Sequence, residues 1–301
     1  MRRFDDALHA LETARDLHQQ MGNTHSEADA WNNLGTVLRD LRRFDDALRA
    51  LETARNLHQQ TGNTNDEADA WNNLGTVLRD LRGFDDALHA LETARNLHQQ
   101  TGNTNDEADA WNNLGTVLQD LRGFDDALHA LETARNLHQQ TGNTHSEAGA
   151  WNNLGRTLKE LRRFDEALHA HQTARNIYQQ IGDTHGEATA WNNLGTTYRG
   201  LGRFDEAVVA GKQAAAMLTA AKDWFRAGEA WGELATTLTT AGADAAQVRE
   251  AWEQSAQAYT QAGADEEAAA SREHANSTKS AETQLPAATD LPETDTASEP
   301  G

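Results

Sequence analysis

Pairs of adjacent asparagines recur along this chain at intervals of 40 residues. Each amide side chain can donate hydrogen bonds through its nitrogen and accept them through its oxygen. A row of such side chains can therefore pair with the main chain of an extended polypeptide without reading its sequence. These asparagines are Asn32, Asn33, Asn72, Asn73, Asn112, Asn113, Asn152, Asn153, Asn192 and Asn193.

Hydroxyl and charged side chains accompany each asparagine pair at fixed spacing, and they could add selection of a partner's side chains. The predicted ligand-binding set therefore also includes Thr36, Thr76, Thr116, Arg156, Arg39, Arg79, Asp69 and Asp109. The alternative is that the asparagines bond to neighbouring helices or to water. One of the two asparagine columns is expected to be structural, and the sequence leaves open which one contacts a ligand.

Nothing in the sequence indicates a catalytic or metal centre. No glycine-rich phosphate loop is present. One histidine column would be the main metal candidate, but it also accepts Tyr and Leu, which is typical of a half-buried packing position. The column holds His18, His58, His98, His138, Tyr178 and Leu218. Helices of adjacent repeats pack roughly 10 Å apart, too far for repeated histidines to share one ion at about 2.1 Å per bond. We therefore expect no enzyme activity, no metal and no cofactor.

The composition excludes several further classes of protein. There is no cysteine, and therefore no disulfide framework or thiolate zinc site. The 26 Lys and Arg against 47 Asp and Glu give a net charge of −21, which repels phosphate backbones and argues against nucleic acid. No apolar run approaches the roughly 20 residues that span a bilayer. We expect a cytoplasmic protein that binds neither nucleic acid nor membrane.

The elements that carry these residues follow from a second periodic signal, the tryptophans at 31, 71, 111, 151, 191 and 231. In each unit the apolar residues fall at helical spacing twice. The first pattern predicts a helix A over Glu67–Leu81, and the second a helix B over Phe84–Gln100. Gly102 is a typical C-terminal stop, and Asn103 can cap the next helix A. All three prolines lie at 286 or later, so we expect an all-α body whose core includes the tryptophans.

The motif Trp31-x2-Leu34-Gly35-x2-Leu38, followed by Ala47-x3-Leu51-x2-Ala54, resembles the tetratricopeptide repeat. The unit of 40 residues is similar to the longer subtype of kinesin light chains, of Leu-Gly-Asn adaptor proteins and of regulators from high-GC bacteria. The resemblance implies an α-solenoid, a right-handed superhelix of antiparallel helix pairs. It departs from the family pattern at Leu38, which replaces Tyr, and at Leu51, which replaces Phe.

Applied to the whole chain, the resemblance predicts fourteen helices within residues 1–276. Residues 1–22 form a helix B that has no preceding helix A, and regular units continue to about 240. A degenerate repeat and a capping helix fill 241–276. Residues 277–301 lack periodicity and are predicted to be a disordered acidic tail. The chain could also be a shortened form of a longer protein.

In tetratricopeptide arrays the A helices line the concave surface, so the resemblance places the asparagine columns along a groove. The favoured function is a non-enzymatic scaffold that binds a peptide or protein segment there. The acidic columns imply a partner with basic character. Two alternatives remain: the sensing arm of a larger bacterial regulator, and a structural array that self-associates. The oligomeric state stays open.

Overall fold

The computed structural model describes residues 2–284, and over this range the chain forms fourteen α-helices and no strand. The helices are α1 (Arg2–Gln20), α2 (Thr24–Asp40), α3 (Phe44–Thr61), α4 (Thr64–Asp80), α5 (Phe84–Thr101), α6 (Thr104–Asp120), α7 (Phe124–Thr141), α8 (Thr144–Glu160), α9 (Phe164–Ile181), α10 (Thr184–Gly200), α11 (Phe204–Ala220), α12 (Trp224–Thr240), α13 (Ala245–Ala262) and α14 (Asp265–Gln284). The predicted all-α solenoid and its number of helices are confirmed.

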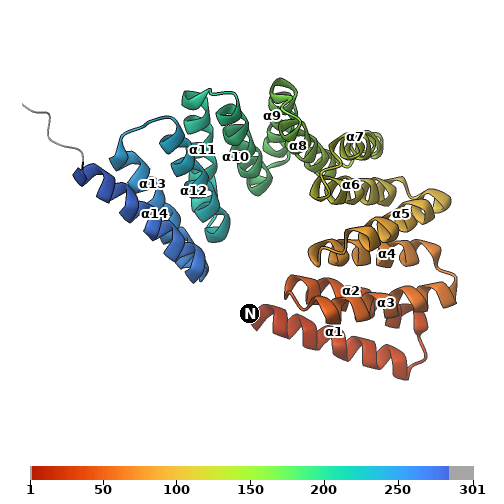
Figure 1. The fold of residues 1–301 in the computed structure, drawn as a ribbon. Coiled ribbons are helices and arrows are strands. Elements are labelled where there is room, and N and C mark those ends of the chain that lie inside the picture. Colours follow the sequence, from red (N-terminus) through yellow and green to blue (C-terminus); the bar gives the residue numbers. More distant parts are fainter. Residues whose placement is uncertain (1, 285–301) are drawn as a thin grey trace, which may run out of the picture.

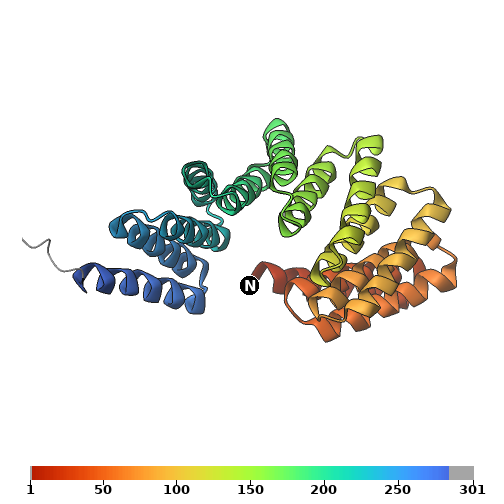
Figure 2. The same cartoon turned by 45° about the horizontal axis from the view of Figure 1, so that its top comes forward.

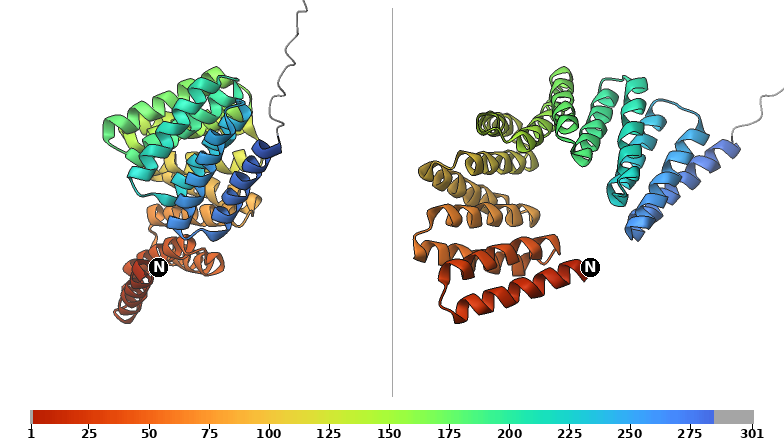
Figure 3. Two further views of the ribbon diagram at one scale, coloured as in Figure 1. Left: turned by 90° about the vertical axis from the view of Figure 1, so that its left-hand side faces the viewer. Right: turned by 180° about the vertical axis from the view of Figure 1, so that it is seen from behind.

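Each even-numbered helix from α2 to α12 is a helix A, and it pairs with the helix B that follows it. We number these pairs as repeats 1 to 6. Every helix packs against its neighbours in the chain, and successive A helices also contact one another. The result is an arc whose first and last helices face each other across an opening (Figures 1 and 2). The view from behind shows the same arc, with α1 at one end and α14 at the other (Figure 3, right).

The helix ends follow the predicted capping chemistry. The side chain of Asn103 caps α6 by accepting a hydrogen bond from the backbone N–H of Asp106. Gly102 ends α5 in the left-handed conformation, with φ of 72°, which a residue without Cβ adopts at little cost. These caps fix the short turn between one repeat and the next, and therefore fix the spacing of the A helices.

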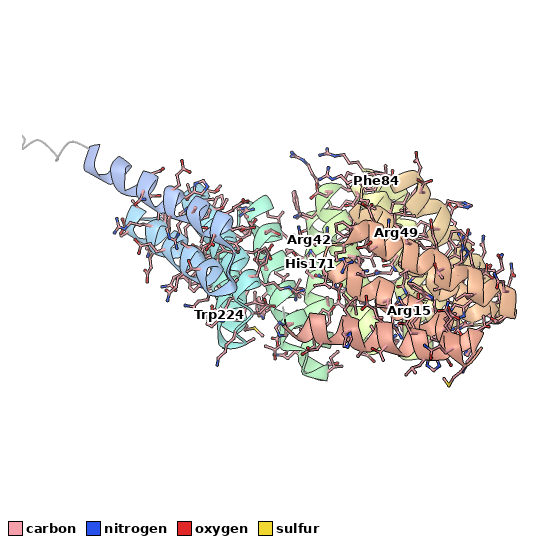
Figure 4. The ribbon with its side chains drawn as sticks, turned by 90° about the horizontal axis from the view of Figure 1, so that it is seen from below. Arg15, Arg42, Arg49, Phe84, His171 and Trp224 are labelled. Carbon is pink, nitrogen blue, oxygen red and sulfur yellow. The ribbon has the colours of Figure 1, made fainter. Side chains whose placement is uncertain are left out.

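The core lies between the two helices of each repeat. Leu74 of α4 and Leu91 of α5 are buried, and Gly75 allows their helices to approach closely. A Cβ added at Gly75 would lie 2.5 Å from Cγ of Leu91, well inside contact distance. In repeat 4 the position of Leu91 is taken by His171. Figure 4 labels this side chain, which is fully buried against Gly155.

Two expectations differ from the structure. The capping helix α14 continues to Gln284, so residues 277–284, assigned above to the tail, are helical. The remainder of the predicted tail lies outside the described residues. The tryptophans are half-buried and pack against the edge of the core rather than inside it, as Trp31 and Trp71 do against the cluster that contains Leu34 and Leu74. Within the described range, no helix combines the length and apolar character needed to cross a membrane.

Candidate functional site

The predicted binding residues lie on the A helices, at the surface where these helices meet on the inner side of the arc (Figure 1). Of the asparagines, Asn33 is exposed and Asn152 is buried, while the other eight are half-buried. Arg156 is exposed, whereas Thr36, Arg39, Asp69 and their counterparts in repeats 2 and 3 are half-buried. The structure therefore brings the predicted set onto one face.

The asparagines form a ladder between repeats. Nδ2 of Asn73 donates to Oδ1 of Asn32 at 3.1 Å, which joins the second asparagine of one repeat to the first of the preceding repeat. The same bond recurs three times at 2.9–3.0 Å: Asn113 to Asn72, Asn153 to Asn112, and Asn193 to Asn152. Both columns thus have a structural role, whereas only one structural column was expected from the sequence.

The hydrogen bonds of the ladder do not use all the donors and acceptors of the amide side chains. Two asparagine side chains carry four N–H groups and two oxygens, and the bond between Asn73 and Asn32 uses one N–H and one oxygen lone pair. Each pair therefore retains donors and an acceptor on the inner face. Asn152 is the exception, since it is buried and its oxygen also lies 3.0 Å from Nδ1 of His171.

The threonine and arginine columns also connect repeats. The guanidinium of Arg39 donates to the hydroxyl of Thr76 at 2.9 Å, and its Nε lies 3.7 Å from Asp80. Arg79 repeats this arrangement with Thr116 at 3.1 Å and Asp120 at 3.2 Å. The acidic column of Asp80 and Asp120 is therefore paired with arginine from the preceding repeat, which reduces the negative charge that it presents.

The other acidic column has no such arginine and faces buried histidines. Oδ1 of Asp69 lies 3.5 Å from Nε2 of His98, and Oδ1 of Asp109 lies 3.5 Å from Nε2 of His138. Burial lowers the pKa of His98 and of His138, so both rings are neutral at pH 7. The imidazoles therefore do not neutralise the two carboxyl groups.

Burial and like charge raise the pKa of these acids. Burial is the largest cause for Asp69 and, with repulsion from Asp106, raises its pKa to about 7. The same two causes raise the pKa of Asp109 to about 6. A cation placed between these carboxyl groups would relieve the repulsion, so this column is the part of the inner face that a basic group would favour.

The asparagines and the acids that lack an arginine partner line one common cavity. A cavity of about 230 Å³ is lined by Asn32, Asp69, Asn72, Asn73, His98, Asp106 and Asp109. It combines open amide groups with the carboxyl groups that lack an arginine. Further along, a cavity of about 340 Å³ has a mixed lining of Gln119, Asp120, Arg122, Phe124, Arg156, Lys159 and Glu160. The inner face is therefore acidic in repeats 1 to 3 and becomes more basic at α8.

Two kinds of contact between different columns of the repeat were not predicted from the sequence. The histidines of helix B were expected in half-buried packing positions, whereas His58, His98 and His138 are 1% exposed and touch the acids of helix A. The arginines that lie over the half-buried tryptophans were also not predicted, such as Arg15 over Trp31 at 4.7 Å. The period of 40 residues aligns each column with itself, and therefore gives no direct signal for contacts between columns.

Comparison with known proteins gives a consistent result for the fold. The family model for the tetratricopeptide repeat matches five overlapping stretches, residues 1–60, 26–100, 66–140, 106–180 and 146–220. No curated protein matches the chain in sequence. Among solved structures, the apo form of RapI is similar with a TM-score of 0.70 and 14% identity, over 87% of this chain and 94% of that chain.

Two further structures share the fold. A protein from Podosopora anserina, described as a kinesin light chain with nearly identical repeats, has a TM-score of 0.56 and 14% identity over 66% of this chain and 98% of that one. A signal-transduction ATPase from Pyrococcus horikoshii with a tetratricopeptide-repeat sensor has a TM-score of 0.65 and 13% identity, over 82% of this chain and 39% of that chain. At these identities the likeness concerns the fold alone.

Proposed function

Because the chain belongs to the tetratricopeptide-repeat family, we propose that it is a non-enzymatic scaffold that binds an extended polypeptide segment along its A helices. The observation that carries this proposal is the cavity in which Asn72 and Asn73 lie beside Asp69 and Asp109. Amide groups suit the peptide main chain, and carboxyl groups suit a cationic side chain. One surface therefore offers partners for both parts of a basic segment.

The asparagines and the acidic column of Asp69 and Asp109 are expected to contribute differently to binding, because their environments differ. A net hydrogen bond from an asparagine contributes about 0.5–1.5 kcal/mol, and several such bonds along the ladder would give most of the affinity. The acidic column is half-exposed, so its charges mainly steer the encounter and are screened over about 8–10 Å at physiological salt. We therefore propose a partner with Lys or Arg opposite repeats 1 to 3.

The experiment starts from peptides selected out of a random displayed library against the tag-free chain. We expect the selected peptides to be enriched in Lys or Arg. Their affinity is then measured for the double variant Asp69→Asn and Asp109→Asn, which retains the shape of both side chains. Two partly exposed charge pairs are worth about 0.4–2 kcal/mol together. The Kd should rise by roughly two- to thirtyfold at low salt.

A matched control removes two aspartate charges from B helices instead of A helices. Asp86 and Asp126 are exposed in the first turns of α5 and α7. Binding is measured at pH 8, above the raised pKa values of Asp69 and Asp109, so that the double variant Asp86→Asn and Asp126→Asn has nearly the same net charge as the test variant. The proposal requires that this control bind nearly as well as the wild type. Equal losses in both variants would mean that only the overall charge matters, and peptides without basic enrichment would contradict the partner class.

A second candidate function is the sensing arm of a larger regulator. The similarity to the signal-transduction ATPase with a tetratricopeptide-repeat sensor favours it, since this chain spans 39% of that protein. Sequencing the reading frame on both sides of this segment tests the idea directly. An adjoining nucleotide-binding or DNA-binding domain would support it. A self-associating array, the third possibility, predicts a sedimentation coefficient that rises with protein concentration.

A further inference from the structure

Four side chains from three consecutive helices converge at the start of the array. His25 and Asp29 come from α2, His58 from α3 and Asp66 from α4. His25 lies 3.7 Å from Asp29 through Nε2 and 3.8 Å from Asp66 through Nδ1. His58 lies 3.8 Å from Asp29 through Nε2 and 4.0 Å from Asp66 through Nδ1. One ligand atom from each residue falls within 4.8 Å of all the others.

The imidazole rings and carboxylates of this cluster are not hydrogen-bonded to one another. The separations between rings and carboxylates exceed the 2.7–3.2 Å of an N–H···O hydrogen bond, so none of these pairs is hydrogen-bonded. His58 is only 1% exposed, and its Nδ1 has no hydrogen-bond partner among the described residues. This nitrogen faces Asp66 across the cluster. A buried nitrogen without a partner costs free energy, which a ligand bound there would recover.

We propose that His25, Asp29, His58 and Asp66 bind one divalent transition-metal ion, with Zn²⁺ as the reference ion. Two imidazole nitrogens and two carboxylate oxygens are typical ligands of such ions. Bonds of about 2.0–2.1 Å place tetrahedral ligand atoms about 3.3–3.4 Å apart. The four separations above use both nitrogens of each ring, whereas an ion takes one ligand atom from each residue. Those atoms lie up to 4.8 Å apart, so some of them must approach by up to about 1.4 Å on binding. Asp66 is positioned by Asn63, whose amide nitrogen donates to it and lies 3.4 Å from Nδ1 of His25.

The exposed members of the cluster make this approach feasible. The side chains of His25 and Asp29 are 52% and 46% exposed, so they can move and an ion can enter from solvent. Bound to all four residues, the ion would join α2, α3 and α4. It would thus act as a cross-link between repeat 1 and repeat 2, and it would stabilise that end of the array by binding only the folded state.

The other repeats lack the full set. Repeat 2 has Asn65 where repeat 1 has His25, which leaves Asp69, His98 and Asp106 as a group of three. Repeat 4 has His145 at this position but Tyr178 in place of His58, and repeat 5 has His185 but Leu218. Within residues 2–284, both histidines occur together in repeat 1 only. Histidines of one column lie too far apart to share an ion, whereas His25 and His58 belong to two different columns that meet in this cluster.

The test uses the tag-free chain and a chromophoric chelator that competes for Zn²⁺. We expect one tight site per chain, a rise in melting temperature when the ion is added, and a Co²⁺ derivative with the visible absorption of a four-coordinate site. His25→Asn recreates the composition of repeat 2 and should weaken the site at least tenfold. Asp29→Asn, also at an exposed position, should do the same without disturbing the fold.

Two controls distinguish the site from scattered surface histidines, of which the chain has many. His145→Asn removes an exposed histidine from α8 and should leave the tight site unchanged. Asn65→His rebuilds the full set in repeat 2 and should add a second tight site. The proposal is overturned if no saturable site exists, if His25→Asn binds as tightly as the wild type, or if His145→Asn weakens binding equally.

Discussion

Gly75 illustrates how a single residue sets the distance between two helices. Its backbone lies against Leu91, and the space that a side chain would need is already filled by Cγ of Leu91. Leu91 is fully buried and well packed, so it has little room to move. Gly83, eight residues later, sits in the turn with no heavy atom closer than 3.6 Å to an added Cβ.

These two glycines provide the first prediction. Gly75→Ala should lower the free energy of unfolding by about 1–3 kcal/mol through overpacking. Gly83→Ala should leave the free energy of unfolding unchanged or raise it by about 0.4–1 kcal/mol. Alanine can adopt the φ of −80° that Gly83 has, and it lowers the conformational entropy of the unfolded chain. Urea unfolding of both variants checks the pair. Similar losses in both would show that the close approach between α4 and α5 is not the cause.

The second prediction concerns Asp109, whose pKa burial and repulsion from Asp106 raise to about 6. Since the unfolded value is about 3.9, the native state binds more protons than the unfolded state between about pH 4 and 6. Stability should therefore fall as the pH rises through this window. Asp109→Asn should melt higher than the wild type at pH 8 and about equally below pH 4. A difference that is the same at both pH values would contradict the raised pKa.

At the level of residues, the sequence predicted which side chains share the inner face but not how they bond to one another. Asn73 and Asn32 were recognised as surface amides, yet their mutual hydrogen bond depends on how one repeat is rotated against the next. The contact of His98 with Asp69 has the same origin. Periodicity within one helix does not encode this rotation, and therefore these contacts required the structure.

At the level of elements, the A helices α2, α4, α6, α8 and α10 each carry a tryptophan that is covered by an arginine from the preceding helix B. The guanidinium of Arg95 in α5 lies 4.7 Å from the centre of the Trp111 ring in α6. The same stack recurs at Trp31, Trp71, Trp151 and Trp191 with distances of 4.6–4.7 Å. Because Trp111 is half-buried, we expect part of its contribution to the free energy of unfolding to come from the contact with Arg95 rather than from packing in the core.

The third prediction is a double-mutant cycle on this stack. Arg95→Ala should cost about 0.5–1 kcal/mol in the wild type, the usual worth of an exposed cation–π contact. In a Trp111→Leu background the same change should cost close to nothing, since the aromatic face is absent. Equal costs in both backgrounds would assign the effect to other contacts of Arg95, such as its hydrogen bond to Asn96 at 2.8 Å.

The helices themselves were largely predictable. Helix A, expected over Glu67–Leu81, occupies Thr64–Asp80, and helix B begins at Phe84 as expected. Caps such as Asn103 and Gly102 act through neighbouring backbone groups, so the local sequence specifies them. The end of α14 was less predictable, because its polar residues from Ser277 onward carry no apolar stripe that distinguishes helix from tail.

At the level of the whole molecule, each repeat contacts only its neighbours, so stability should be approximately a sum of repeat and interface contributions. The fourth prediction is that Leu114→Ala, at a position only 3% exposed, destabilises α6 and the helices that pack on it. Hydrogen exchange should accelerate in α5, α6 and α7 while α1 and α13 keep wild-type protection. Uniform acceleration along the array would show that it unfolds as one cooperative unit.

The central claim is that a basic, extended polypeptide binds along the A helices, and a binding footprint tests it most directly. Hydrogen exchange should be measured by mass spectrometry with and without the tightest basic peptide selected from the displayed library. We predict slower exchange in α4 and α6, which carry Asp69 and Asp109, and unchanged exchange on α5 and α7. Protection confined to α5 and α7, with none on the A helices, would contradict the account.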